Sequence, residues 1–382
     1  MSEKTYLLGM TVVLGALGLF VWKTRPPATA NASTLAPPSA LAKWPLSGAT
    51  TGTGTRGVTH LIARDADGTD IDLLEFDFKI NPRLKLELFD QDGDDAHPFD
   101  NSARYWGRNA AYVLTHESNP RNPLLAVCNG GPFTFDRSKT LDEAAHVAPL
   151  VVAGQAHFTN VSSDQSQLWA FGVSANPGNT APRFEALLRP SPNQLRGFDY
   201  ATGGVQCLIK DGAPLHLDEP PGTKKWSRFK PPSPGDVGTL GRPDWAKTSR
   251  ISLAWSRDNS KLWMLSIHDP ESESVSRVAL SLRFRELSDA STPPVSGGWS
   301  TLDVQNFWKS RGAYCAVLLA SGDFAQLATR QGNGQINFVP SQVATRFWKT
   351  AAGRTRLIST PSLRGAPTGG SALFYWTVRE TK

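Results

Sequence analysis

The chain contains little cysteine: 3 of its 382 residues, Cys128, Cys207 and Cys315. They are too few and too widely spaced for a disulfide framework, and none lies in the CxxC or Cys/His spacing of a zinc site. A single bridge between Cys128 and Cys207 remains open. Each cysteine lies within an apolar run, so a buried, unreactive thiol is the favoured state. The sequence predicts no cysteine nucleophile.

Common catalytic motifs are also absent. The chain has no GxSxG elbow, no GxxxxGK[ST] phosphate loop and no GxGxxG that opens a helix, which removes the usual hydrolase, kinase and dehydrogenase signatures. Its 7 histidines show no HExxH or HxH pairing, so zinc catalysis has no support. The sequence predicts no metal site and no cofactor, and it leaves a divalent cation open.

One acidic run, Asp90 to Asp95, superficially resembles a calcium loop. An EF-hand would need glycine at position 95 and a bidentate glutamate at position 101, where this chain has Asp95 and Asn101. The run is therefore predicted to be a hairpin turn.

The composition is that of a folded domain, with 40% hydrophobic residues, 33 Gly and 28 Pro, which favours many turns and strands. The net charge is +6, and the segment from Arg330 to Lys382 alone carries eight Lys/Arg against one acid, Glu380. A solvated basic face is the simpler interpretation. The alternative is a surface for anionic glycans, wall polymers or lipid headgroups.

The N-terminus predicts membrane targeting. Tyr6 to Trp22 carries no charge and approaches the length of a bilayer-spanning helix. An uncleaved signal anchor is favoured over a signal peptide cleaved after the small residues 28–30. Residues 1–25 are therefore assigned to a signal anchor or signal peptide. The domain is expected to be extracytoplasmic, either periplasmic or at the cell surface, or secreted if the N-terminus is cleaved.

Two further segments complete the predicted domain organisation. Residues 26–56 are rich in Pro, Ala, Ser and Thr and should form a linker. Residues 57–382 should form one folded domain. No RNA- or DNA-binding motif occurs in it, so nucleic acid is not an expected partner.

Hydrophobic periodicity predicts a sheet-rich fold. Residues 58–63, 69–78 and 83–89 approach strict alternation and predict an antiparallel opening. Further short apolar runs read as strands: AAYVL, PLLAV, APLVVA, LWAFGV, VQCLI, ISLAW, LWMLSI, VALSLRF and YCAVLL. The clearest helix is Leu302 to Arg311, capped by Ser300 or Thr301 and stopped by Gly312. The predicted class is α+β, a mixed and largely antiparallel sheet core with a few helices, preceded by an N-terminal membrane helix.

Four blocks then agree in order and spacing with one family. They are AVCNGGPF (126–133), FDYATGGVQCLIKDGAPL (198–215), SRISLAWSRDNSKLWMLSIHD (249–269) and STLDVQNFWKSRGAYCAVLLASGDF (300–324). Together they resemble the phosphodiester glycosidase domain family, whose members remove a sugar from a sugar phosphodiester. The resemblance implies an extracytoplasmic hydrolase that cleaves a glycosyl phosphodiester and takes a sugar-phosphate or glycan substrate.

The resemblance also implies a set of site residues. Arg250 would clamp phosphate and Asn129 would hold a sugar hydroxyl or a phosphate oxygen. The family carries an aspartate in Leu-Asp-Gly-Gly, whereas this chain has Leu319-Ala320-Ser321, so the acid is either lost or displaced to Asp323. The alternatives are a turn-only role for Asn129 and a surface or strand-end arginine for Arg250.

Other residues in the matched blocks have lesser roles. The substrate-binding set is completed by Gly130, Gly131, Phe133, Asp136 and Asp269. Lys210-Asp211-Gly212 is interpreted as a structural hairpin turn. The competing hypothesis is a catalytically degenerate protein of the same fold that binds a glycan or a cell-wall polymer.

Overall fold

A computed structural model describes the chain between Gly48 and Lys382 with gaps. The described residues are 48–65, 69–103, 108–136, 143–158, 169–175, 181–215, 217, 249–268, 298–321, 325–339, 346–349, 355–358 and 372–382. All of them belong to the unit Leu41–Lys382. The predicted membrane helix and the run VALSLRF lie outside the described residues.

The larger sheet has twelve strands, and every strand pair in it is antiparallel. Its main path runs β1-β2-β3-β15-β14-β16-β12-β10-β11, while β8 and β13 pair with β12, and β9 pairs with β8. The strands are β1 (Gly48–Gly52), β2 (Val58–Arg64), β3 (Asp70–Asp77), β8 (Leu150–Val152), β9 (Gln155–His157), β10 (Trp169–Ser174), β11 (Arg183–Leu188), β12 (Tyr200–Lys210), β13 (Ala213–Pro214), β14 (Arg250–Trp255), β15 (Lys261–His268) and β16 (Cys315–Ser321).

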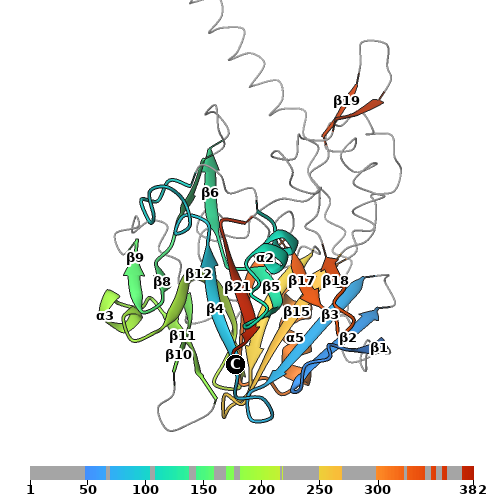
Figure 1. The fold of residues 1–382 in the computed structure, drawn as a ribbon. Coiled ribbons are helices and arrows are strands. Elements are labelled where there is room, and N and C mark those ends of the chain that lie inside the picture. Colours follow the sequence, from blue (N-terminus) through green and yellow to red (C-terminus); the bar gives the residue numbers. More distant parts are fainter. Residues whose placement is uncertain are drawn as a thin grey trace, which may run out of the picture. The chain divides into compact units, whose positions relative to one another are not determined.

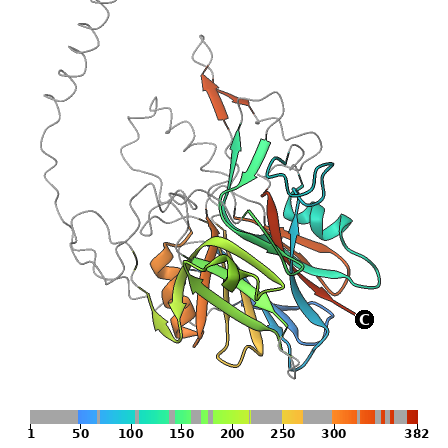
Figure 2. The ribbon, with the colours of Figure 1, turned by 90° about the vertical axis from the view of Figure 1, so that its left-hand side faces the viewer.

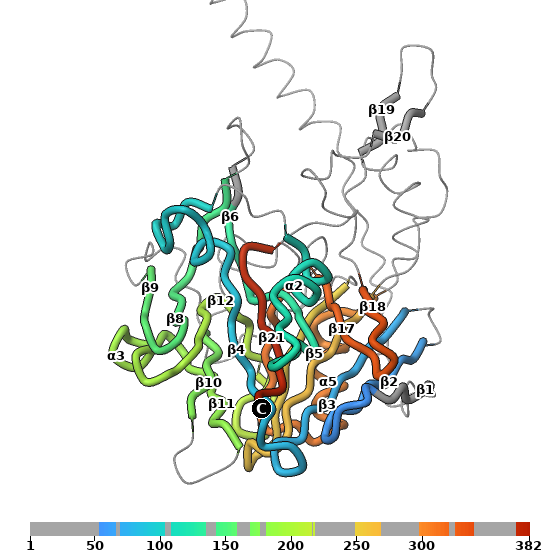
Figure 3. The backbone as a smooth tube through the Cα atoms, viewed as in Figure 1, coloured from blue at the N-terminus to red at the C-terminus, as the bar shows by residue number. Residues whose placement is uncertain are grey.

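The smaller sheet has five strands in the order β18-β17-β5-β21-β4, again with antiparallel pairs. They are β4 (Leu84–Asp90), β5 (Leu124–Asn129), β17 (Leu327–Arg330), β18 (Ile336–Val339) and β21 (Phe374–Glu380). Two separate ribbons are formed by β6 (Phe133–Asp136) with β7 (Glu143–His146), and by β19 (Arg346–Lys349) with β20 (Thr355–Ile358). In the tube view, β4, β21 and β5 run side by side (Figure 3).

The two sheets face each other and each carries a helix on its outer face. The core between them joins residues of both sheets, such as Leu253 and Trp255 of β14 with Cys128 and Trp376. Helix α2 (Ala110–His116) packs on the smaller sheet, and α5 (Thr301–Ser310) packs on the larger one. Figures 1 and 2 show α2 and α5 on opposite sides of the paired sheets. The short helix α3 (Pro192–Leu195) lies near β10 and β12.

The packing explains the apolar runs. All six residues of β14 are buried, because alternate side chains enter the inter-sheet core and the layer under α5. All six residues of β5 are buried for the same reason, between the inter-sheet core and α2. A strand covered on both faces reads as a continuous hydrophobic run rather than as an alternation.

Several sequence predictions are confirmed. The class is α+β, with mostly antiparallel sheets and few helices. Helix α5 begins after Ser300, whose hydroxyl accepts the N–H of Asp303 in a capping box, and Gly312 follows its end with a φ of 73°. Cys128, Cys207 and Cys315 are free and buried, so the open alternative of a Cys128–Cys207 bridge is not formed.

The strand predicted for the run AAYVL was wrong. The run AAYVL lies in α2 rather than in a strand, because Asn109 caps the first turn and Ala110, Val113 and Leu114 form a helical buried face. The larger sheet also begins at β1, within residues 26–56 that the sequence assigned to the linker.

Within the described residues, no helix has the length and apolar character needed to cross a membrane.

Candidate active site

Strands β4 and β5 end at the same edge of the smaller sheet. Both pair antiparallel with β21, so they run parallel to each other and end together at Asp90 and Asn129. Strand β21 begins between them, with Phe374 opposite Asp90 and Tyr375 opposite Asn129. We call this the Asp90–Asn129 edge. Polar residues that follow these strands are thereby brought to one place.

Asn129 is fully buried and ties the two sheets together. Its Oδ1 accepts the backbone N–H of Gln326 at 2.7 Å, just after β16 of the larger sheet and just before β17 of the smaller one. Its Nδ2 is buried and has no hydrogen-bond partner among the residues that the structure describes. A buried amide nitrogen without an acceptor is costly, so this donor is poised to bind a group that approaches the turn.

The two glycines after Asn129 allow close packing. The N–H of Gly130 donates to the carbonyl of Phe374 at 2.9 Å. A Cβ on Gly131 would lie 3.2 Å from Phe374 and 3.3 Å from Oγ1 of Thr202 in β12. The predicted Asn-Gly-Gly turn therefore lies where β21 of the smaller sheet meets β12 of the larger one.

Phe133 follows the turn and brings His146 to this edge of the sheet through strand pairing. It pairs with His146 in the β6–β7 ribbon, and the Nε2 of His146 lies 3.1 Å from Oδ1 and from Oδ2 of Asp90. Only the Oδ1 contact has hydrogen-bond geometry. The imidazole stacks on Phe158 at 4.7 Å and tilts against Phe374 at 5.0 Å. Aromatic rings thus shield the Asp90–His146 pair from water.

Asp92 lies beside this pair and is also buried. Its carboxylate accepts the backbone N–H groups of Asn101 at 3.1 Å and Ser102 at 3.3 Å. Burial, and then the charge of Asp90, raise the pKa of Asp92 to about 6, against the opposing effects of His146 and the two backbone donors. Asp90 and Asp92 do not belong to a hairpin: the run turns back onto residues 99–102 instead of a paired strand, which corrects the sequence prediction.

We call Asp90, Asp92 and His146 the acid–histidine cluster. One potential ligand atom of each lies within 4.8 Å of those of the other two, and all three residues are buried. The sequence analysis missed this cluster, because His146 follows Asp90 by 56 residues and belongs to no short motif. The only local signal was the acidic run itself.

Arg250 is the first residue of β14 in the larger sheet. It is 1% exposed, and its Nε donates to the carbonyl of Trp299 at 3.2 Å. Its register partners are Ile267 in β15 and Ser321, the last residue of β16. The alternative of a surface arginine is therefore excluded. Gln326, which donates to Asn129, follows Ser321 by five positions.

The other predicted carboxylates are not observed at this site within the described part of the chain. Asp323 and Asp269 lie outside the described residues. Asp136 ends β6 opposite Glu143 at the far end of the ribbon from Phe133 and His146. Lys210-Asp211-Gly212 forms the predicted turn between β12 and β13, with φ values of 54° at Asp211 and 81° at Gly212.

Together, these residues offer the chemistry of anion binding and of acid–base catalysis. Arg250 supplies a permanent positive charge, and Asn129 supplies a free amide donor. The acid–histidine cluster supplies carboxylates and an imidazole, which serve either in proton transfer or as ligands of a cation.

Comparisons with known proteins give fold-level likeness only. No family model and no curated protein matches the chain. Among solved structures, it is similar to the catalytic domain of zebrafish N-acetylglucosamine-1-phosphodiester alpha-N-acetylglucosaminidase, auto-inhibited by its pro-peptide. That match has 13% identity and a TM-score of 0.45, and it covers 88% of this chain and 87% of the other. A hypothetical protein from Synechocystis matches at 12% identity and a TM-score of 0.40, over 85% of this chain and 62% of the other.

Proposed function

We propose that the chain is an extracytoplasmic hydrolase that cleaves a glycosyl phosphodiester, anchored to the membrane by its N-terminal segment. The four sequence blocks that resemble the phosphodiester glycosidases motivate the substrate class. The observation that best supports the site is the hydrogen bond from the backbone N–H of Gln326 to the side chain of Asn129. It joins the Asn-Gly-Gly turn to the segment after Ser321, the residue that pairs with Arg250.

In this proposal the substrate phosphate is held by Arg250 and by the free Nδ2 of Asn129. The guanidinium neutralises a phosphodiester oxygen, and the glycine turn lets the ligand approach the backbone. Water then bonds to the anomeric carbon while the bond from that carbon to the bridging oxygen breaks. The bridging oxygen leaves with the phosphate as a phosphomonoester, and the transition state resembles an oxocarbenium ion.

The general acid or base of this step is assigned to Asp323, two positions after the partner of Arg250. Such a carboxyl group protonates the departing oxygen or activates the water. In the sequence, Asp269 follows the last residue of β15 and lies two positions after Ile267, which also pairs with Arg250. Both assignments rest on sequence position.

The test is sugar release from a panel of sugar-1-phosphodiesters by the full-length chain and by its Arg250→Lys and Asp323→Asn variants. Turnover by the wild type that falls in both variants supports the hydrolase. Turnover that is unchanged in Asp323→Asn removes that residue from the mechanism. Circular dichroism of each variant establishes that it is folded.

A specific observation favours a second candidate function, a protein that binds a glycan or a wall polymer without cleaving it. The position where the related family carries its acid is Ala320, whose side chain is 3% exposed and belongs to the inter-sheet core. An apolar core residue there cannot transfer a proton. Binding of the same compounds that depends on Arg250, with no turnover on any of them, selects this function.

A further inference from the structure

The acid–histidine cluster places two buried carboxylates next to each other, and His146 is the one member that can carry a positive charge. Asp90 is 5% exposed and Asp92 is fully buried. Two neighbouring buried carboxylates repel each other, so they need a shared proton, a protonated imidazole or a bound cation. We propose that Asp90, Asp92 and His146 bind one divalent transition-metal ion.

An independent feature of Asp90 points to a ligand. Its Oδ1 accepts the N–H of Asp92 and faces His146, both at 3.1 Å. Its Oδ2 is buried and receives no hydrogen bond from any described residue, although it lies 3.1 Å from Nε2 of His146. An anionic oxygen with no donor is energetically costly in a protein interior, and a metal ion satisfies it directly.

The cluster is held in place by a second layer of contacts. Asp92 is oriented by the backbone N–H groups of Asn101 and Ser102. The side-chain oxygen of Asn101 in turn accepts the backbone N–H of His146 at 2.7 Å. The imidazole is clamped by Phe158 and Phe374. Such outer contacts fix ligand orientation before the ion arrives.

Acidic side chains also provide an entry path from solvent. Asp92, Asp95 and Asp100 form a second group whose ligand atoms lie within 4.8 Å of one another. Asp92 is buried, Asp95 is half-buried and Asp100 is exposed, so carboxylates extend from the surface to the cluster. A line of negative charge attracts cations and guides them inward.

The ligand types indicate which ions fit. Imidazole nitrogen together with carboxylate oxygen suits Zn²⁺ or Mn²⁺, whereas Ca²⁺ and Mg²⁺ prefer oxygen ligands alone. The lack of a cysteine ligand disfavours the softest ions. Three protein ligands leave at least one coordination position for water or substrate. The proposal that the cluster binds an ion does not rest on the proposed function. Only a role for the ion in the cleavage of a phosphodiester would rest on it.

The test is isothermal titration of the full-length chain, after treatment with EDTA, with Zn²⁺, Mn²⁺, Ca²⁺ and Mg²⁺ alone. We expect one equivalent of Zn²⁺ or Mn²⁺ to bind, and Asp90→Asn and His146→Gln to weaken that affinity by tenfold or more. Asp72→Asn is the matched control, because Asp72 is another buried aspartate, bound to His60 at 2.7 Å. Its affinity for the ion should equal that of the wild type.

Thermal unfolding of the wild type keeps the test decisive even if a cluster variant fails to fold. An ion that binds only the native state raises the melting temperature further as its free concentration increases above the Kd, and EDTA reverses the rise. No saturable binding and no such rise would overturn the proposal. Binding of equal affinity in wild type and folded cluster variants would equally overturn it, and would mark the ion as adventitious.

Discussion

A side-chain carbon on Gly130 would lie 2.1 Å from Cδ2 of Phe374, well inside van der Waals contact. The phenyl ring therefore rests directly on the backbone of the Asn-Gly-Gly turn. The same ring lies 5.0 Å from His146, so it connects the turn to the acid–histidine cluster. Glycine at position 130 is what permits the two halves of the site to approach each other.

Gly130→Ala should destabilise the fold by about 1–3 kcal/mol, because overpacking against a buried ring forces side chains off their rotamers or shifts the backbone. Urea unfolding measures the change. Gly197→Ala is the control, since its Cβ would meet only a backbone oxygen at 3.3 Å. Equal stability of Gly130→Ala and the wild type would contradict the packing described here.

Tyr375→Phe should destabilise the fold by about 1–3 kcal/mol. The buried hydroxyl donates to the carbonyl of Arg108 at 2.7 Å and accepts the N–H of Ala372 at 2.8 Å. Its removal leaves both backbone groups without this partner at the start of β21. Tyr112→Phe, at a tyrosine that is 39% exposed, should change the free energy of unfolding by less than about 0.5 kcal/mol.

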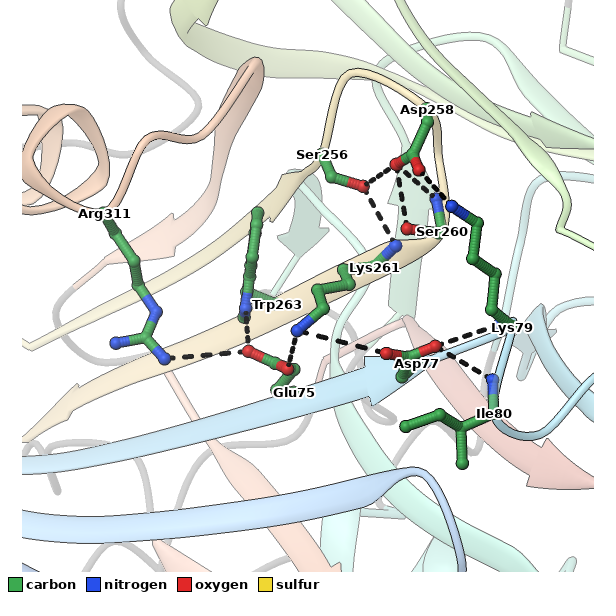
Figure 4. Close-up of polar contacts among 10 residues, drawn as sticks. All are labelled: Glu75, Asp77, Lys79, Ile80, Ser256, Asp258, Ser260, Lys261, Trp263 and Arg311. Carbon is green, nitrogen blue, oxygen red and sulfur yellow. Dashed lines mark hydrogen bonds and ion pairs between the residues drawn. The ribbon is translucent and has the colours of Figure 1, made fainter.

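Acid should remove a contribution that Glu75 makes to stability. Burial raises the pKa of this carboxyl, but hydrogen bonds from Lys261 and Trp263, both at 2.6 Å, and the charges of Lys261 and Arg311 outweigh it and lower the pKa from 4.5. Figure 4 shows these groups converging on Glu75. Because the folded-state pKa is depressed, this stabilisation is complete above the unfolded pKa and is lost as the pH falls through the folded-state value.

Glu75→Gln should therefore flatten the acid limb of the stability curve below about pH 4.5. Urea unfolding at a series of pH values gives the comparison. Glu185→Gln serves as a control, because its ion pair with Arg183 is longer, 3.5 Å, and lies at the surface. A Glu75→Gln curve with the same slope as the wild type below that pH would refute the prediction.

Arg250→Lys should lower kcat/KM for a sugar-1-phosphodiester by tenfold or more, because lysine keeps the charge but loses the planar fork that binds two phosphate oxygens. Arg257→Lys is the matched control. Arg257 lies in the turn at the opposite end of the β14–β15 hairpin, 5.2 Å from the ring of Tyr314. Equal losses in the two variants would show that Arg250 has no special role.

The sequence predicted those parts of the fold that depend on neighbouring residues. Helix α5 carries its own cap at Ser300 and its own stop at Gly312, and the turn at Asn129 follows a continuously buried strand. The run AAYVL was ambiguous, because five apolar residues suit a strand or a helical face equally. The side chain of Asn109 caps the first turn and so favours the helix.

The acid–histidine cluster could not be predicted in the same way. An acidic run normally indicates an exposed turn, and only the pairing of β4 with β21 buries Asp90. His146 reaches Asp90 through the β6–β7 ribbon, a contact that spans 56 residues of sequence. The link from Asn129 to Gln326 spans 197 residues. Contacts over such separations depend on strand order, which hydrophobic periodicity does not encode.

We propose that the chain cleaves the bond between an anomeric carbon and a phosphodiester oxygen. The most direct measurement is hydrolysis of a sugar-1-phosphodiester by the full-length chain in ¹⁸O-labelled water, with mass spectrometry of both products. Cleavage at the anomeric carbon predicts ¹⁸O in the released sugar and none in the phosphomonoester. Label on phosphorus, or no hydrolysis of any member of the panel, would contradict the claim.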